Sequence, residues 1–302
     1  HGAFQYGFLG LEEERPITLN YRQESGEFSA SFQAMAGPCE VLVQCDRKEE
    51  AFRVAKVAAH EAWRLEIKYS RYRDDNLIYQ IHQNRPVSVD EETARLLNFA
   101  AAAYDLSAGD FDITSGILRK LWNFSGNGEA PSRAAIKALL PFIDWKKVSW
   151  DGKTIQVPVG MQIDFGGFGK EYAVDQALAL CHEMSDAPIL VNFGGDLAAN
   201  RKPRSRPQWQ IGIQGAPANF ALEEGAIATS GDANRFIMHR GKKLSHILNP
   251  RTGWPVSQAP CSVSVGMPKC LQAGLIATLA ILQGKKAEEF LKTQEVTHWV
   301  ER

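Results

Sequence analysis

The sequence predicts an α+β fold, and three observations lead to this prediction. Segments with strand spacing mix along the chain with segments of helical spacing, and the strands are the more numerous. No internal repeat, low-complexity run or clear linker divides the chain. The 302 residues are enough for a sizeable core. We therefore expect a single domain over residues 31–302, preceded by an extension of residues 1–30 that wraps on the core or is partly mobile.

In chain order, the first expected element is a short strand at residues 40–45. A helix over residues 48–68 follows, because apolar side chains recur there at helical spacing, at Phe52, Ala55, Ala59, Ala62 and Leu65. Ser88 and Glu91 match a capping box that opens a second helix, whose inward side chains are Leu96, Leu97, Ala100, Ala101 and Tyr104. Turn formers fill residues 105–140, with a loop at 126–128. Residues 143–158 predict a hairpin that turns at Asp151-Gly152.

The second half begins with a helix at residues 171–183, which places Val174, Ala177, Leu178 and Cys181 on one face. A buried strand at 189–193 then ends at Gly194-Gly195. Alternating apolar residues predict another strand through Trp209, Ile211 and Ile213. Strands also fit residues 225–229, 236–240 and 261–267, and helices are expected at 271–283 and 285–293.

Composition excludes several classes of protein. The net charge is −1, which gives no bulk attraction to nucleic acid. No stretch approaches the roughly 20 apolar residues of a membrane span. The five cysteines are odd in number and form no Cys-x-x-Cys, so we expect buried free thiols rather than disulfides or a zinc site. Free cysteines and residues 1–30, which lack the order of a signal peptide, favour the cytoplasm.

A glycine-rich segment, Asp164 to Tyr172, is the first that could carry chemistry. We expect it to follow a strand and to open a helix. Glycines allow a ligand to approach the backbone closely, and a helix N-terminus offers free N–H groups to a phosphate. The segment matches neither a Walker loop nor the Rossmann fingerprint, so a tight strand–helix turn is an equal alternative.

Four further segments place polar residues beside turns. They are Val191 to Asp196 at a strand end, Ala228 to Arg235 with an arginine suited to anions, Ser245 to Gly253 with His246 before a turn, and Tyr72 after the first helix. Each also has a plain structural explanation, as a turn or as packing of the tyrosine.

Taken together and in order, seven segments resemble the ApbE family of flavin transferases. They are Met35, Ser70 to Asp75, Gly109 to Asp112, Asp164 to Tyr172, Asn192 to Asp196, Ser230 to Arg235 and His246 to Gly253. The resemblance runs from about residue 31 to residue 283, nearly the whole chain. It implies an ApbE-like (T-fold-like) α+β architecture, with largely antiparallel sheets flanked by helices.

The resemblance also implies roles for single residues. Met35 and Tyr72 would contact the isoalloxazine, Tyr72 by stacking. Asp164 and Lys170 would hold the nucleotide, and His246 and Asp164 are the candidate catalytic residues. The remaining flavin-binding positions would be Asp110, Phe111, Asp112, Asn192, Gly195, Asp196, Ser230, Gly231, Asp232, Arg235, His246 and Ile247. Magnesium would be held by the carbonyl of Gly167 and by the positions of Gly274 and Thr278.

The magnesium positions contain a departure from the family. The family has an Asp where this chain has Gly274, while Thr278 is kept. Loss of a carboxylate should weaken a hard-cation site. Three outcomes stay open: another acid replaces it, the pyrophosphate and waters supply the coordination, or the chain does not catalyse. Smaller departures are Ala36 and Glu171, each in place of a Gly, Ala233 for Tyr and Asn249 for Asp.

The function that the resemblance implies is transfer of FMN from FAD to a Thr or Ser hydroxyl of an acceptor flavoprotein, with Mg²⁺ present and AMP released. His246 would serve as general base or contact the leaving phosphate. Alternatives are a non-catalytic FAD carrier, an FAD pyrophosphatase and an unrelated α+β enzyme. Many family members work in the cell envelope, so a periplasmic location is the alternative to the cytoplasm.

Overall fold

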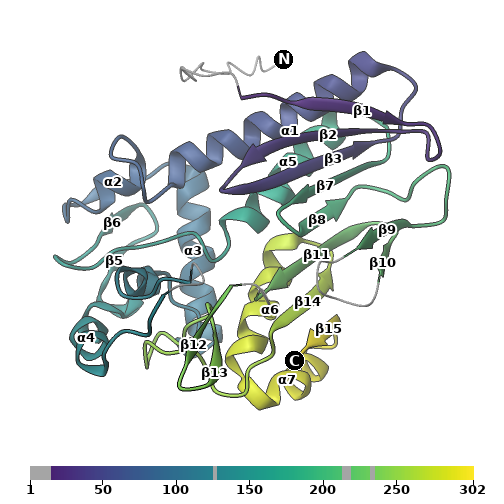
Figure 1. The fold of residues 1–302 in the computed structure, drawn as a ribbon. Helices are drawn as coiled ribbons and strands as arrows, with labels where there is room; N and C mark the ends of the chain where they lie inside the picture. The colour runs from purple at the N-terminus through teal and green to yellow at the C-terminus, as the bar shows by residue number, and fades with distance from the viewer. Residues whose placement is uncertain (1–14, 125–127, 213–218, 232–234) are drawn as a thin grey trace.

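A computed structural model describes residues 15–124, 128–212, 219–231 and 235–302, and Figure 1 shows their arrangement. The core of the fold is an eight-stranded sheet in the order β1-β2-β3-β7-β8-β11-β14-β15, and every neighbouring pair is antiparallel. Its strands are β1 (Thr18–Arg22), β2 (Glu27–Ala34), β3 (Gly37–Val43), β7 (Ile189–Phe193), β8 (Asp196–Ala199), β11 (Gly225–Ser230), β14 (Ser262–Met267) and β15 (Thr297–Glu301).

Three helices cover one face of this sheet: α1 (Lys48–Tyr69), α5 (Gly169–Met184) and α6 (Cys270–Leu282). Side chains alternate between the two faces of a strand, so Ile189 and Val191 of β7 point into the main core beneath these helices, whereas Leu190 points to the opposite face. That face is closed by β9 (Trp209–Gly212), paired with β10 (Asn219–Leu222), and Trp209 is completely buried there.

The remaining described elements are short. The helices are α2 (Leu77–Ile81), α3 (Glu91–Leu106), α4 (Arg133–Leu139) and α7 (Ala287–Thr293), with 3-10 turns η1 (Ile113–Lys120), η2 (Leu140–Phe142), η3 (Trp145–Lys147) and η4 (Gly284–Lys286). The strands are β4 (Val87–Ser88), β5 (Ser149–Trp150) and β6 (Thr154–Gln156) in one small sheet, and β12 (Phe236–His239) with β13 (Lys242–Ser245) in another.

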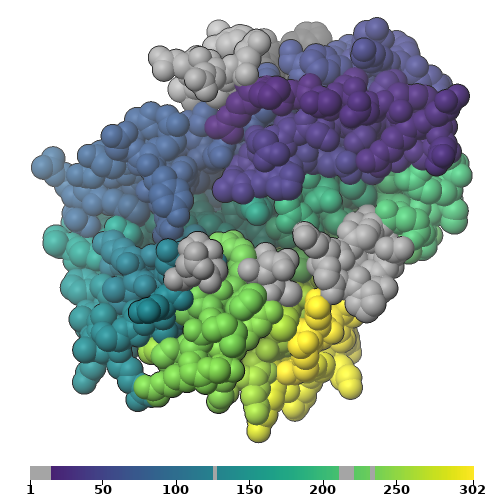
Figure 2. Space-filling view, viewed as in Figure 1, coloured from purple at the N-terminus to yellow at the C-terminus, as the bar shows by residue number. Residues whose placement is uncertain are grey.

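A separate apolar cluster lies beside the main core. It joins η1, α4 and β12 through Ile117, Leu118, Trp122, Ile136, Ile143 and Ile237. In the space-filling view the teal segments around α4 and the green β12–β13 hairpin lie against each other on one face (Figure 2). Trp122 fixes this cluster, because its buried Nε1 donates a hydrogen bond of 2.9 Å to the carbonyl of Gly253. The cluster therefore forms a second wall beside the sheet.

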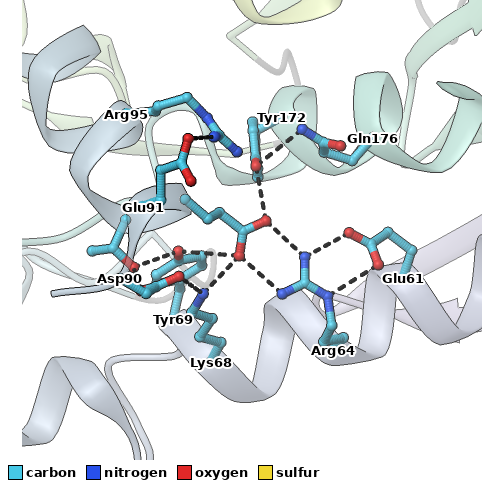
Figure 3. A network of polar contacts seen from close by, with 11 residues as sticks. Glu61, Arg64, Lys68, Tyr69, Asp90, Glu91, Arg95, Tyr172 and Gln176 are labelled. Atoms are coloured by element: carbon cyan, nitrogen blue, oxygen red, sulfur yellow. Dashed lines mark hydrogen bonds and ion pairs between the residues drawn. The ribbon is translucent and has the colours of Figure 1, made fainter. Parts of the chain in front are cut away.

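A polar network ties α1, α3 and α5 together (Figure 3). Glu92 of α3 accepts hydrogen bonds from Arg64, at 2.9 and 2.7 Å, and from Lys68 at 2.7 Å. It also accepts one from the hydroxyl of Tyr172, at 2.9 Å. Burial by itself raises the pKa of Glu92, but the hydrogen bonds from Arg64 and Lys68 outweigh it and lower the pKa to about 2. The network fixes the first turn of α5, which also carries Lys170 and Glu171.

The α+β fold is confirmed, and so are the helices expected at 48–68, 171–183, 271–283 and 285–293, within two residues at each end. The expected strands 189–193, 225–229, 236–240 and 261–267 are also present to within a residue. The hairpin expected at 143–158 is present but shorter, and it begins after residue 148. The strand expected through Trp209 is present at residues 209–212. The strand expected at 40–45 runs instead from 37 to 43. Residue 213 and residues 126–127 of the expected loop lie outside the described residues.

Two local predictions were wrong. The capping box of Ser88 and Glu91 does not form, because Ser88 belongs to β4 and the helix begins at Glu91 with Asp90 in the N-cap position. No strand directly precedes Asp164, since β6 ends at Gln156 and the chain between is irregular. Residue 30, the last of the expected N-terminal extension, lies in β2, where Phe28 and Ala30 are buried in the main core, and the division of the chain at this residue stays a prediction.

All five cysteines are free thiols, and four of them are buried, as expected. No helix in the described part of the chain is long and apolar enough to span a bilayer.

Candidate active site

A cleft of about 880 Å³ separates the sheet and its helices from the second apolar cluster. It gathers residues from segments that are far apart in the sequence. Of the residues predicted from the sequence, the cleft is lined by Tyr72, Asp110, Phe111, Asp112, Asp164, Gly167, Lys170, Asp196, Ser230, Gly231, Arg235, His246, Ile247 and Thr278. A second cavity of about 1000 Å³, between α4 and the β12–β13 hairpin, contains none of them.

Four predicted residues in the described part of the chain do not line the cleft, namely Met35, Asn192, Gly195 and Gly274. Met35 lies in the β2–β3 turn, where its backbone N–H donates to Glu66. Asn192 accepts a hydrogen bond from the N–H of Gly195 and so shapes the turn after β7. Gly274 is buried in α6. Asp232 lies outside the described residues. The roles predicted for these residues in flavin and magnesium binding stay predictions, as do those of the residues that line the cleft.

Tyr72 offers an open aromatic face at one end of the cleft. Its side chain is 83% exposed, so the alternative that it packs into the protein does not apply. The guanidinium of Arg71 lies 4.7 Å from the ring centroid and donates a 2.7 Å hydrogen bond to the hydroxyl. This contact holds the ring in place, and a flat heterocycle can stack on it.

Asp164 organises the positive charges of the cleft. It accepts a 2.7 Å hydrogen bond from the N–H of Gly166, which shapes the glycine turn before α5. Its Oδ2 lies 3.5 Å from Arg71 and 3.8 Å from Arg119. Nε of Arg71 is buried and has no hydrogen-bond partner among the described residues. Both arginines therefore present donors to an anionic ligand.

Sequence reasoning missed Arg71 and Arg119 as members of the site. Arg71 stands next to the tyrosine of a quoted motif, and this adjacency is a signal that could have found it. Arg119 has no comparable signal, because η1 brings it to Asp164 only through the tertiary fold.

Asp112 and Phe111 build the floor of the cleft. The buried carboxylate of Asp112 accepts hydrogen bonds from the backbone and hydroxyl of Thr114 and from the N–H of Trp145. It thus caps η1 and joins it to η3, and burial raises its pKa. Phe111 packs against Phe168, with ring centroids 6.1 Å apart.

His246 directly follows β13 and lines the cleft. Its ring meets Phe124 edge-on at a centroid distance of 6.3 Å. The turn after it is closed by Asn249, whose side chain accepts a 2.8 Å hydrogen bond from the N–H of Arg251 and whose carbonyl accepts one from Gly253. An asparagine makes these bonds without a charge, which explains how Asn249 can stand where the family has Asp.

The opposite wall of the cleft carries two carboxylates and two hydroxyls. Asp196 is buried and accepts a 3.1 Å hydrogen bond from the N–H of Thr229, and burial raises its pKa above the usual range of a carboxyl group. Burial and then repulsion from Asp196 raise the pKa of Glu171 well above its usual range. The hydroxyls of Ser230 and Thr278 are 2.9 Å apart. Lys170 adds a cation beside Gly194. A Cβ placed on this glycine would lie only 2.9 Å from Nζ of the lysine.

This wall has the chemistry of a partial site for a hard cation. Magnesium prefers charged and neutral oxygens and takes further ligands from phosphates and water. Among the described residues, no group of three or more His, Cys, Asp or Glu side chains could hold a metal by itself. Two carboxylates and the Thr278 hydroxyl fit a cation whose remaining ligands come from a bound pyrophosphate.

Comparison with known proteins finds a matching family and relatives of this sequence. The family model described as "ApbE family" matches residues 35–299. The FAD:protein FMN transferase of Chlamydia pneumoniae is 30% identical over 228 residues, which cover 73% of this chain and 72% of that protein. The FAD:protein FMN transferase of Haemophilus influenzae is 24% identical, covering 74% and 70%.

Solved structures agree with these relatives. The crystal structure of the ApbE protein of Thermotoga maritima has a TM-score of 0.79 and 26% identity, covering 95% of this chain and 94% of its own. The apo flavinyl transferase ApbE of Pseudomonas stutzeri, at 22% identity, shares the fold with a TM-score of 0.77 over 95% and 91% of the chains.

Proposed function

This chain belongs to the ApbE family, and we propose that it is an FAD:protein FMN transferase. It would move FMN from FAD to a Thr or Ser hydroxyl of an acceptor flavoprotein and release AMP. Relatives with this name cover most of the chain. The observation that carries the proposal is the cleft itself, because it combines an open aromatic face, several cations and a carboxylate wall.

The cleft offers partners for two parts of FAD, the isoalloxazine ring and the pyrophosphate. Tyr72 offers a stacking face for the isoalloxazine ring. Arg71, Arg119 and Lys170 supply positive charge for the two phosphates. Positioning and neutralising the pyrophosphate are the main tasks in phosphoryl transfer.

The reaction breaks one phosphoanhydride bond. The oxygen of the acceptor hydroxyl attacks the phosphorus on the FMN side and forms a phosphoester. The bond from that phosphorus to the bridging oxygen breaks, and AMP leaves with this oxygen. The hydroxyl proton passes to a base, for which His246 is our candidate because its imidazole lines the same cleft as the cations and carboxylates. Asp164, held by two arginines, would position them rather than take the proton.

Magnesium is the cofactor that this wall fits. Glu171, Asp196 and Thr278 would hold it together with the pyrophosphate, and the carbonyl of Gly167 is a further candidate. When bound, Mg²⁺ polarises the phosphates and offsets their charge. The free cysteines favour work in a reducing compartment, and the periplasm or cell envelope stays the alternative.

One assay separates this proposal from its two rivals. The purified chain is incubated with FAD, Mg²⁺ and a flavin-acceptor domain, and AMP and in-gel flavin fluorescence are measured. A transferase gives AMP together with a fluorescent acceptor band. A pyrophosphatase gives AMP and free FMN without the acceptor, and a carrier binds FAD but gives no AMP. Either of these two results would contradict the proposal.

The role of His246 has its own test. His246→Ala should lower the transfer rate by about 10²-fold or more if the imidazole is the base, a larger factor than any accompanying loss of FAD affinity. His246→Asn keeps a polar side chain of similar size, so it separates loss of the base from loss of shape. An unchanged transfer rate in both variants would remove the role.

A further inference from the structure

The side chain of Glu171 occupies the space that a side chain at Gly274 would need. A Cβ placed on Gly274 would lie 2.7 Å from Oε1 of Glu171 and 3.0 Å from its Cδ. The two residues belong to different helices, α5 and α6, which pack against each other. A carboxylate therefore stands beside the first half of α6, although it is carried by α5.

At these two positions the chain departs from its family in opposite ways, because it gains a carboxylate at one and lacks a carboxylate at the other. The resemblance places a Gly at position 171 and an Asp at position 274, and this chain has Glu171 and Gly274. The number of carboxylates is unchanged by the exchange. Gly274 and Thr278 are four residues apart on α6, so they share a face of the helix.

Both helices are held firmly where the exchange occurs. Tyr172, next to Glu171, is bonded to Glu92 in the network that joins α1, α3 and α5. The first turn of α6 is bonded to α5, because Asp175 accepts hydrogen bonds from the N–H groups of Cys270 and Leu271, at 2.8 and 3.0 Å. The position of the Glu171 carboxylate is therefore set by the packing of two anchored helices.

The electrostatic setting of Glu171 calls for a cation. Asp196 is the neighbouring charge with the largest effect on Glu171, since two carboxylates in one buried place repel each other, and Lys170 offsets this repulsion only in part. The salt bridges of the cleft involve Asp164 and Asp110. None among the described residues involves Glu171. Part of its surface is open to the cleft, where a ligand can reach it.

We propose that Glu171 is the carboxylate ligand of a divalent cation in this chain, in place of an acid on α6. The cation would lie between α5 and α6, bound by Glu171 and Asp196 with the hydroxyl of Thr278, and completed by the pyrophosphate of FAD. The inference deepens the proposed function, since it assumes a nucleotide in the same cleft. The competing explanation is that Glu171 only fills the space left by Gly274.

Direct measurement of Mn²⁺ binding separates the two explanations without any transfer reaction. Free Mn²⁺ is followed by electron paramagnetic resonance as the full-length chain is titrated in the presence of FAD. Glu171→Gln keeps the size of the side chain but removes its charge. We expect it to raise the Kd for Mn²⁺ by at least about tenfold, because a hard cation loses a charged ligand. Glu183→Gln, on the exposed part of α5, is the control and should leave the Kd unchanged.

A charge-relocation pair sharpens the test. Gly274→Asp alone forces the new Cβ against Glu171 and should lower thermal stability. Glu171→Gly combined with Gly274→Asp removes this clash and returns the carboxylate to α6, so Mn²⁺ affinity should recover to within about threefold of the original chain. Glu171→Gly alone should lose affinity as Glu171→Gln does.

The proposal is overturned if Glu171→Gln binds Mn²⁺ as tightly as the unmodified chain, or if the unmodified chain with FAD binds no Mn²⁺. Failure of the proposed function gives a different pattern. In that case Mn²⁺ binding depends on Glu171, while no FMN is attached to an acceptor.

Discussion

Arg251 and Asp110 join two segments of the cleft that lie far apart in the sequence. Nη1 of Arg251 lies 3.0 Å from Oδ1 of Asp110, and its Nη2 donates a hydrogen bond to the carbonyl of Ala108. The arginine thereby fastens the loop before Phe111 to the turn after His246. One charged contact sets the spacing between the floor of the cleft and the wall that carries the candidate base.

Breaking this contact should affect ligand binding more than stability. Arg251 is 54% exposed, and exposed ion pairs contribute about 1 kcal/mol or less to folding. We expect Arg251→Ala and Asp110→Asn each to raise the Kd for FAD by roughly three- to tenfold, with little change in the melting temperature. Both substitutions remove the same contact. The Kd of the double variant for FAD should therefore be no higher than that of the single variant that binds FAD more weakly. Additive losses in calorimetric titrations would contradict the shared role.

Tyr72 should contribute to FAD affinity through its ring and not its hydroxyl. Stacking of a flat heterocycle on an aromatic side chain is worth about 1–3 kcal/mol. Tyr72→Ala should therefore raise the Kd for FAD about tenfold or more, while Tyr72→Phe retains most of the affinity. Tyr79→Ala removes a partly exposed tyrosine that does not line the cleft, and it should leave the Kd unchanged. Flavin fluorescence quenching measures all three, and equal affinities would remove the stacking role.

Glu92 should make the stability of the chain fall in acid. Its pKa is about 2 in the folded chain and near 4.5 when unfolded, so its contribution is complete above 4.5 and is lost as pH falls towards 2. Between pH 7 and about pH 3 this amounts to about 2 kcal/mol. Urea unfolding at both values should show a smaller loss in Glu92→Gln than in the unmodified chain. An equal loss would mean that the network does not lower the pKa of Glu92.

The β2–β3 turn should be stabilised by a glycine. Met35 and Ala36 both have positive φ, 51° and 60°, as a two-residue hairpin turn of this hand requires. A non-glycine residue is strained in this region, and the strain outweighs the extra freedom that glycine has when unfolded. Ala36→Gly should raise the free energy of unfolding by about 0.5–1 kcal/mol.

The matched control for the turn is Ala102→Gly in α3, where φ is helical. There the same replacement should lower stability by about 1 kcal/mol. If both variants are destabilised in urea unfolding, the strain at Ala36 is not real.

Periodicity in the sequence was enough to predict the long helices α1, α5 and α6, which pack against the sheet. The apolar spacing of α1 and the small-residue face of α5 are local signals. The edge strands β1 and β15 were missed, because their side chains are mostly exposed or half-buried and show no clear alternation. Strand β8 was missed for the opposite reason, since all four of its residues are buried.

The candidate site was predictable where a motif carries its own turn, as with Asp164 and Gly166. It was not predictable where residues meet only through the tertiary fold. The approach of Glu171 to Gly274 depends on how α5 packs on α6, and that of Arg119 to Asp164 depends on η1. Neither pair has a spacing in the sequence that would reveal it.

The central claim is that FMN becomes bonded to an acceptor protein, and the intact mass of that protein tests it most directly. After incubation with the chain, FAD and Mg²⁺, an acceptor domain with a Thr or Ser at its flavinylation site should gain the mass of FMN less one water. The same domain with that residue changed to Ala should gain nothing. An unmodified acceptor, in a reaction where FAD is bound or is converted to free FMN and AMP, would contradict the account.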